Sequence, residues 1–257
     1  MDSPAYRGIF ISHGAPTLAL DHHPAHDFLA ALGRALPRPR AIVVLSPHWR
    51  TAAFAVKHAG RFRAVHDFSG FPPELYELRY TPPGAPELAA EVEGIIAASG
   101  LPTGRVMDDG IDHGVWIPLM LMYPQADVPV VPVSISSAGP EAHFQLGRAL
   151  AGLGHDDVLI LGSGGAVHNL HEISLTGPVP EWAAGFDEWT CRQVLAGDWQ
   201  ALQAYRRLAP QAARAHPTEE HFMPLFVAGG VAGQATVLHR SFSYGSLGMA
   251  AYGFSPI

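Results

Sequence analysis

The stretch AIVVLSPHW, residues 41–49, decides the fold class of this chain. Its run of apolar and mostly branched side chains predicts a strand that is buried on both faces. Strands of this kind form parallel sheets that helices cover on both sides. The same pattern returns in RGIFIS at 7–12 and in DVLILGSG at 157–164. The strand predicted in the first stretch is AIVVLS at 41–46, and a histidine follows each of the three predicted strands within four residues.

Helical segments alternate with these strands. Amphipathic patterns that end near proline or glycine predict helices at 26–36, 87–100, 141–153 and 181–197. A further strand is predicted at 128–135, where prolines favour an irregular or edge position. Residues 235–254 are typical of paired antiparallel strands. We therefore expect one α/β sandwich domain over residues 1–257, with a central mixed, largely parallel sheet flanked by helices.

The composition argues against several classes of protein. Charged residues make up 15% of the 257 residues, the net charge is −7, and Lys57 is the single lysine. A basic surface that follows phosphates is therefore not expected, so we predict no nucleic-acid partner. Cys191 is the single cysteine, which suits a reducing compartment. Because no signal peptide or spanning apolar run is visible, we predict a cytoplasmic protein with no membrane partner.

Histidine is unusually frequent, with 15 residues against 16 lysines and arginines. It is the commonest metal ligand and acid–base residue. His13, His48 and His168 each follow a different predicted strand. Ligands of open α/β sheets bind beyond the carboxyl ends of the strands, so the sheet can bring these histidines together. A single histidine at such a place is usually a loop residue, but three in equivalent places favour a common site.

Two further histidines have suggestive neighbours. His113 lies beside Asp112 in DDGIDHGVWIPL, and a nearby carboxylate raises the basicity of an imidazole. His221 lies three residues after Thr218 in HPTEEHFMPLF. If Thr218 caps a helix, His221 lies in the first turn, where the helix dipole favours the neutral imidazole that binds metals. A surface histidine at a helix start is the alternative interpretation.

Competing motifs are weak. GSGG at 162–165 lacks the lysine of a P-loop and the spacing of a dinucleotide turn, so we interpret it as a tight turn that aims His168. HEISL at 171–175 lacks the second histidine of a zinc protease, and no GxSxG elbow occurs. These absences leave the histidines as the residues with the strongest case for chemistry.

Several segments, taken in order, resemble one known family. They are SHGAP, VVLSPHW, VHDFSGFPPELYELRYTPPG, DHGVWIPLMLMYP, GSGGAVHNL, PTEEHFMPLF and GSLGMAAYGF. Together they are similar to the 4,5-DOPA extradiol dioxygenases, a branch of the class III (protocatechuate 4,5-dioxygenase catalytic-subunit type) extradiol ring-cleavage enzymes. The resemblance implies a single-domain α/β fold with one divalent metal ion per chain.

The resemblance also implies residue roles. His13, His48 and His221 are expected as metal ligands, and His168 as the catalytic base or as a fourth metal ligand. His113 is expected to line the site as an acid–base or oxygen-binding residue. Protocatechuate-type relatives hold iron with two histidines and a glutamate, whereas here the third ligand is expected to be His221. Three neutral histidines also suit zinc, so the identity of the metal stays open.

The implied activity is extradiol cleavage of a DOPA-like or related catechol with O2, a reaction of aromatic catabolism. Fe(II) is expected for this activity, and Zn(II) is a second candidate in the purified protein. Two alternatives remain at this point: a zinc-dependent hydrolase that activates water, and a non-catalytic metal-binding protein of the same fold. The sequence carries no signal for the oligomeric state, for the particular catechol, or for the bond that is cleaved.

Overall fold

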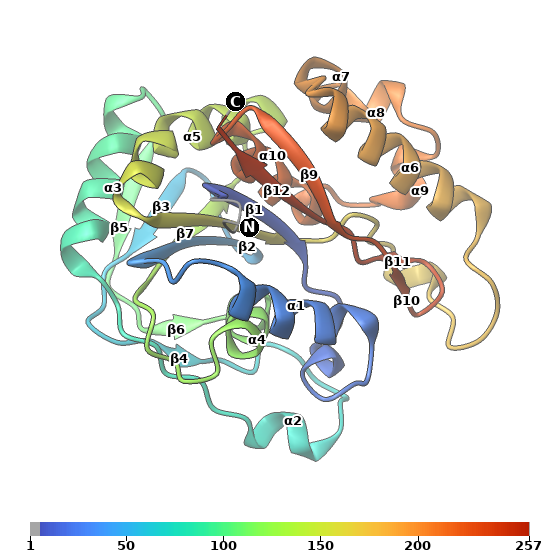
Figure 1. The fold of residues 1–257 in the computed structure, drawn as a ribbon, viewed down its shortest axis with the longest axis horizontal. Coiled ribbons are helices and arrows are strands. Elements are labelled where there is room, and N and C mark those ends of the chain that lie inside the picture. Colours follow the sequence, from blue (N-terminus) through green and yellow to red (C-terminus); the bar gives the residue numbers. More distant parts are fainter. Residues whose placement is uncertain (1–5, 257) are drawn as a thin grey trace.

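The computed structural model describes residues 6–256, apart from the side chains of residues 155 and 156. An eight-stranded sheet forms its centre, in the order β5-β3-β7-β2-β8-β1-β12-β9 (Figure 1). These strands are β1 (Gly8–Ser12), β2 (Ala41–Thr51), β3 (Phe54–Lys57), β5 (Thr103–Val106), β7 (Val130–Ser136), β8 (Val158–Gly164), β9 (Gln234–His239) and β12 (Ala251–Ser255). The run β7-β2-β8-β1 is parallel, while β12 and β9 add antiparallel strands. The mixed, largely parallel sheet predicted from the sequence is thus confirmed.

Helices cover both faces of this sheet (Figure 1). On one face, α1 (Pro24–Ala35) and α4 (His113–Met122) pack on side chains such as Ile9 and Val44. On the other face, α3 (Pro86–Ala98), α5 (Pro140–Leu150) and α10 (Met223–Gly230) pack on side chains such as Phe10 and Val43. Successive residues of a strand point to opposite faces of the sheet. Because helices cover both faces, β1 and β8 are buried along their whole length.

The remaining elements lie around this core. They are the helices α2 (Pro73–Glu77), α6 (Glu181–Ala196), α7 (Trp199–Gln203), α8 (Tyr205–Leu208) and α9 (Ala212–Ala215), and the short strand pairs β4 (Arg63–Ala64) with β6 (Gly110–Ile111) and β10 (Phe242–Ser243) with β11 (Leu247–Gly248). The four long helices expected from the sequence are all present, with ends shifted by at most three residues.

Two details of the predicted strands were wrong. For the proline-containing strand β7 the edge position is wrong, since β7 lies between β3 and β2, whereas the irregular position is confirmed by the register shift in its pairing with β2. Because β3 meets it at the single register pair Val56–Val133, this side of β7 needs few backbone donors, and Pro132 is tolerated. The strand expected to end at residue 46 continues to Thr51, so His48 lies within β2 and not after it.

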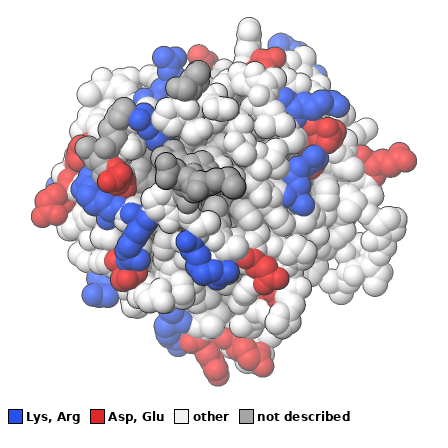
Figure 2. Space-filling model, viewed as in Figure 1, with Lys and Arg blue, Asp and Glu red and all other residues white. Residues whose placement is uncertain are grey.

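Lysines and arginines are interspersed with aspartates and glutamates on the face shown in Figure 2. This view holds no continuous basic surface, and the absence of a nucleic-acid partner stays a prediction. No helix within residues 6–256 is both long enough and apolar enough to cross a membrane.

Candidate metal centre

Five histidines meet at the carboxyl ends of the central strands. His13 directly follows β1, His48 lies in β2, and His113 is the first residue of α4. His168 follows β8, and His221 lies just before α10. The ring centroids of His13, His48 and His221 are 5.0–5.5 Å apart. The centroids of His48 and His113 are 4.0 Å apart, and those of His168 and His221 are 3.4 Å apart. The structure therefore brings together all five histidines that the sequence singled out.

An irregularity in β2 places His48. Ser46 is in register with Ser134 of β7, and the next register pair joins Arg50 to Ile135. The residues between Ser46 and Arg50 therefore have no partner in β7, and His48 is the middle one of them. Such a bulge bends the strand locally and re-aims a side chain, as bulges beside functional sites do.

Glycines allow the other segments to approach. Gly14 has a φ of +62°, which lets the chain turn directly after His13. A Cβ atom at Gly164 would lie 2.3 Å from the carbonyl oxygen of His221. The N–H of Gly165 donates to that same carbonyl at 2.9 Å. The GSGG run therefore seats the His221 segment against the end of β8.

The proton positions of two imidazoles follow from their partners. The hydroxyl of Ser163 donates to the carbonyl of Gly114, so it accepts the Nδ1–H of His13 at 3.0 Å. Nδ1 of His221 lies 3.2 Å from Oε1 of Glu220, a carboxylate oxygen that only accepts. Both rings therefore carry their proton on Nδ1 and present the lone pair of Nε2, as metal-binding histidines with such outer partners do.

The donor atoms fit a divalent metal ion. Nε2 of His221 is buried and has no hydrogen-bond partner within the described part of the chain. Leaving such an atom unpaired is costly, and a metal ion would satisfy it. Nε2 of His13 lies 3.1 Å from Nε2 of His48, a separation that suits two nitrogens bound to one ion at about 2.1 Å.

His113 also belongs to a compact group of donors. One ligand atom each of His13, His48 and His113 lies within 4.8 Å of the other two. The family resemblance implied an acid–base or oxygen-binding role for His113 and His221 as the third ligand. His13 and His48 belong both to this group and to the predicted ligand set with His221. The identity of the third ligand therefore stays a prediction.

Burial keeps the imidazoles of His13, His48, His168 and His221 neutral. Burial and the neighbouring imidazoles hold the pKa of His13 and of His221 well below the ordinary value. Burial lowers the pKa of His48 to about 3, although the carboxylates of Asp67 and Glu220 oppose the shift. Burial also lowers the pKa of His168 to about 4. The neutral imidazole is the form that binds metals and accepts protons.

Asp67 is a site residue that the sequence reasoning missed. Both of its carboxylate oxygens lie 3.0 Å from Nδ1 of His113, and Oδ1 also accepts the backbone N–H of His113 at 2.9 Å. Burial alone would raise the pKa of Asp67, but the bonds from His113 bring it below the ordinary value. The segment VHDF carried this residue among the family-like motifs, yet no spacing rule linked it to a histidine 46 positions away.

Two predicted neighbours act differently from expectation. The carboxyl group of Asp112 accepts a hydrogen bond from Ser46 at 2.6 Å, so the carboxylate that binds His113 is Asp67 and not its sequence neighbour. Thr218 does not cap a helix, because Glu219 holds the N-cap position of the turn that follows and no side chain caps it; the hydroxyl of Thr218 donates to Oε1 of Glu220 at 2.7 Å. His221 lies in the 3₁₀ turn Glu220–Phe222, so burial and not a helix dipole keeps it neutral.

Aromatic side chains border the cluster near His113. Trp116 donates its indole N–H to the carbonyl of Val65 at 2.9 Å, which fixes the loop that carries Asp67. Phe68 meets the ring of His113 edge-on at a centroid distance of 5.7 Å. These contacts form one aromatic wall with His66, Phe71 and Tyr76.

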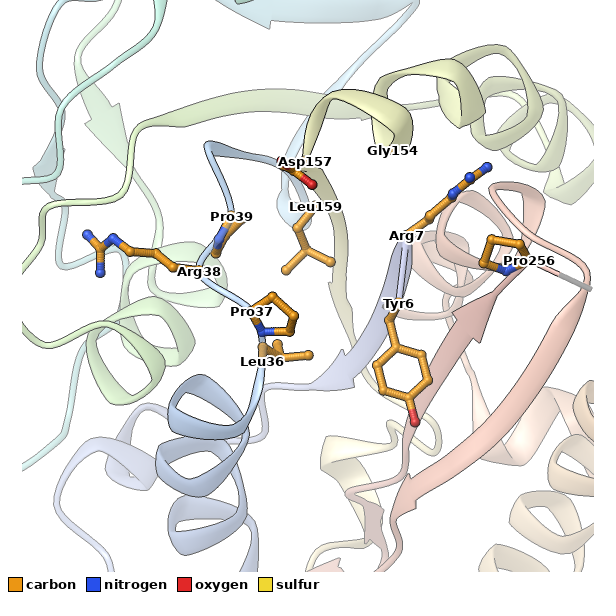
Figure 3. Close-up of a pocket in the computed structure, with 10 residues that line it drawn as sticks. All are labelled: Tyr6, Arg7, Leu36, Pro37, Arg38, Pro39, Gly154, Asp157, Leu159 and Pro256. Atoms are coloured by element: carbon orange, nitrogen blue, oxygen red, sulfur yellow. The ribbon is translucent and has the colours of Figure 1, made fainter. Parts of the chain in front are cut away.

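A different cavity lies at the opposite ends of the strands. Figure 3 shows its lining, which includes Tyr6 and Arg7 at the start of β1 and Leu159 near the start of β8. Its volume is about 260 Å³. None of the five histidines lines it, so it is separate from the candidate metal centre.

The fold and this cluster define a class of protein. A largely parallel α/β sheet that gathers neutral histidines at the carboxyl ends of its strands can hold a metal ion with open positions for small ligands. Residues 7–255 match the family described as the catalytic LigB subunit of aromatic ring-opening dioxygenase. The chain belongs to this family.

Similar proteins agree with the family match. The chain is 39% identical over 255 residues to a 4,5-DOPA dioxygenase extradiol of Beta vulgaris, covering 96% of this chain and 95% of that protein. It is 36% identical over 264 residues to the protein of the same name from Escherichia coli K12, covering 97% and 94%. The crystal structure of the uncharacterized protein JW3007 from Escherichia coli K12 matches with a TM-score of 0.80, at 32% identity, over 96% of this chain and 98% of that one.

The enzyme class follows from these matches. The chain is a metal-dependent extradiol ring-cleavage dioxygenase, as the resemblance of its motifs implied. The two alternatives, a zinc hydrolase and a non-catalytic metal-binding protein, are not favoured.

Proposed function

We propose that this enzyme cleaves a DOPA-like catechol with O2 at a single metal ion held by His13, His48 and His221. The observation that carries this proposal is the convergence of three neutral imidazoles, two of which have their protons fixed on Nδ1 by Ser163 and Glu220. We further propose that residues 1–257 form one catalytic domain that acts in the cytoplasm.

Fe(II) is the proposed metal. When bound, it supplies Lewis acidity to the catechol hydroxyls and a path for electrons from the catechol to O2, which Zn(II) lacks. The reaction is balanced without another reductant. One carbon–carbon bond of the ring breaks beside the two hydroxyl-bearing carbons, and both atoms of O2 enter the ring-opened product.

His168 is proposed as the base that accepts a catechol proton. Its ring lies parallel to that of His221, with planes 8° apart and centroids 3.4 Å apart. The lone pair of an imidazole nitrogen lies in the plane of its ring. Because the rings of His168 and His221 lie in two separate, nearly parallel planes, their lone pairs do not point at the same metal ion. This supports the base role over the fourth-ligand role. Because burial disfavours the imidazolium, His168 would return the proton readily during ring opening.

His113 is proposed as a second acid–base group. Its Nδ1–H donates to Asp67, which leaves Nε2 to accept a proton, and the carboxylate stabilises the cation that results. Nε2 could then donate a hydrogen bond to an oxygen atom of the reactants. Phe68 and the rest of the aromatic wall would limit water at this side of the site.

Anaerobic reconstitution of the metal-free protein tests the function. Fe(II) or Zn(II) is added, then L-DOPA and air-saturated buffer, and oxygen uptake and the absorbance of the product are followed together. One O2 consumed per yellow ring-opened product, with Fe(II) alone, is expected. A product that forms with Zn(II) in the absence of oxygen would instead identify a hydrolase.

A further inference from the structure

A second cavity adjoins the histidine cluster. Its volume is about 290 Å³, and its charged and hydroxyl-bearing lining residues are Arg50, Ser136, Ser137, Arg206, Thr218, Glu219 and Glu220, of which Arg206 and Glu219 pair with each other. Arg50 follows His48 by two residues on β2, and Glu220 contacts Nδ1 of His221. None of the five histidines lines this cavity, but Arg50 and Glu220 join its wall to the segments that carry His48 and His221.

Arg50 is uncommitted. No hydrogen-bond or ion-pair partner within residues 6–256 reaches its guanidinium, although it lies at the wall of a cavity. The arginines of the loop at 61–80 have partners. Arg61 donates to the carbonyl of Thr81, and Arg63 pairs with Asp109. The arginines of the 61–80 loop therefore do not offer the free positive charge that Arg50 offers.

Glu220 provides the opposite charge. Its Oε1 accepts hydrogen bonds from the hydroxyl of Thr218 and from the Nδ1–H of His221. No hydrogen bond from the described residues reaches its Oε2. The side chain is 19% exposed, so it can still meet a ligand. Arg50 and Glu220 do not pair with each other, which leaves a positive and a negative group apart on one cavity.

From this arrangement we propose that the cavity binds the α-amino-acid head group of the substrate. Arg50 would bind the carboxylate, with the hydroxyl of Ser136 beside it, and Oε2 of Glu220 would accept a hydrogen bond from the ammonium group. A guanidinium and a carboxylate are the groups that match the two charges of a zwitterion. This inference rests on the proposed function, because it assumes that the catechol ring lies at the histidine cluster.

The test compares four catechols in the Fe(II)-loaded enzyme. L-DOPA carries both charges, 3,4-dihydroxyphenylpropionate the carboxylate only, dopamine the ammonium only, and 4-methylcatechol neither. Arg50→Gln should lower kcat/KM about 10- to 100-fold for the two carboxylates, as the loss of a charged hydrogen bond does, and leave the other two unchanged. Arg192→Gln, an exposed arginine on α6, is the matched control and should change nothing.

A binding measurement separates this inference from the proposed function. Titration calorimetry of the metal-free protein with L-phenylalanine should show binding in the wild type and in Arg192→Gln, but at least tenfold weaker binding in Arg50→Gln. If no catechol is cleaved while this pattern holds, the proposed function fails and the head-group site stands. If Arg50→Gln lowers all four kcat/KM values equally, or lowers none, the head-group site is overturned.

Discussion

Both carboxylate oxygens of Asp67 lie 3.0 Å from Nδ1 of His113, and the backbone N–H of His113 donates to the same carboxylate. Asp67 therefore sets both the tautomer and the orientation of this imidazole. Asp67 lies between His66 and Phe68 of the aromatic wall, and Trp116 ties this loop to α4 through the carbonyl of Val65. The imidazole of His113 thus depends on a contact between segments that are distant in sequence.

Asp67→Asn should lower kcat about 10²- to 10⁴-fold, the value of positioned acid–base catalysis, with little change in KM. The amide can donate to Nδ1 and so favours the wrong tautomer of His113. Oxygen-uptake kinetics measure the loss, and nitrogen NMR of the labelled metal-free protein reports the tautomer. Asp109→Asn, which removes the exposed partner of Arg63, is the control and should keep wild-type kcat. Wild-type kcat in Asp67→Asn would refute the positioning role.

His168→Ala should abolish turnover and retain the metal ion, because the ring stacks on His221 and does not share its plane. Metal content after gel filtration and oxygen uptake are measured on the same sample. Replacement of His171, an exposed residue three positions later, should change neither quantity. Loss of the metal together with turnover in His168→Ala would identify His168 as a ligand instead.

The sequence predicts the positions of the histidines better than their partners. The strand patterns correctly predict that His13, His48 and His168 lie near the carboxyl ends of the central strands, because periodicity and burial are local signals. The Asp67–His113 and Ser163–His13 contacts join residues 46 and 150 positions apart, and nothing local encodes them. His221 became a candidate through its distance from Thr218, an argument that the missing cap removes, and through the family-like motif PTEEHFMPLF.

The same limit explains the errors. Asp112 precedes His113 directly, but the helix start turns its carboxyl group toward Ser46. Thr218 lies at the right distance from His221 to cap a helix, but its hydroxyl donates a hydrogen bond to Glu220 instead. In both cases a polar side chain had more than one partner within reach, and the tertiary packing selected the one that sequence distance did not favour.

Gly164→Ala should destabilise the fold by about 1–3 kcal/mol and weaken metal binding, because its Cβ would lie 2.3 Å from the carbonyl oxygen of His221. Either β8 or the His221 turn must move. Gly94→Ala is the control: nothing lies within 4 Å of a Cβ there, and Gly94 is inside α3, so a stabilisation of about 0.5–1 kcal/mol is expected. Urea unfolding of metal-free proteins and metal titrations measure both effects. Equal stability of the two variants would contradict the close approach.

Acid should destabilise the metal-free protein, and His143 allows this to be tested away from the metal centre. Its Nδ1–H donates to the carbonyl of Gly139 at 2.9 Å, and its Nε2 accepts the N–H of Ser136 at 3.3 Å. These two hydrogen bonds require the neutral form of the ring. Burial lowers the pKa of His143 to about 4. The unfolded chain, with a histidine pKa of about 6.5, then binds more protons than the folded one between those two pH values.

The free energy of unfolding should therefore fall as the pH drops from about 6.5 to about 4, by up to about 1.4 kcal/mol per pH unit for each such histidine. His216, whose pKa burial lowers to about 3, adds to the same slope. Urea unfolding at several pH values, with the metal chelated, gives the slope for the wild type. In His143→Gln the slope should be smaller by up to one proton, because a glutamine takes up none on unfolding. An unchanged slope would mean that the folded protein tolerates a protonated His143, in conflict with the N–H that Ser136 directs at Nε2.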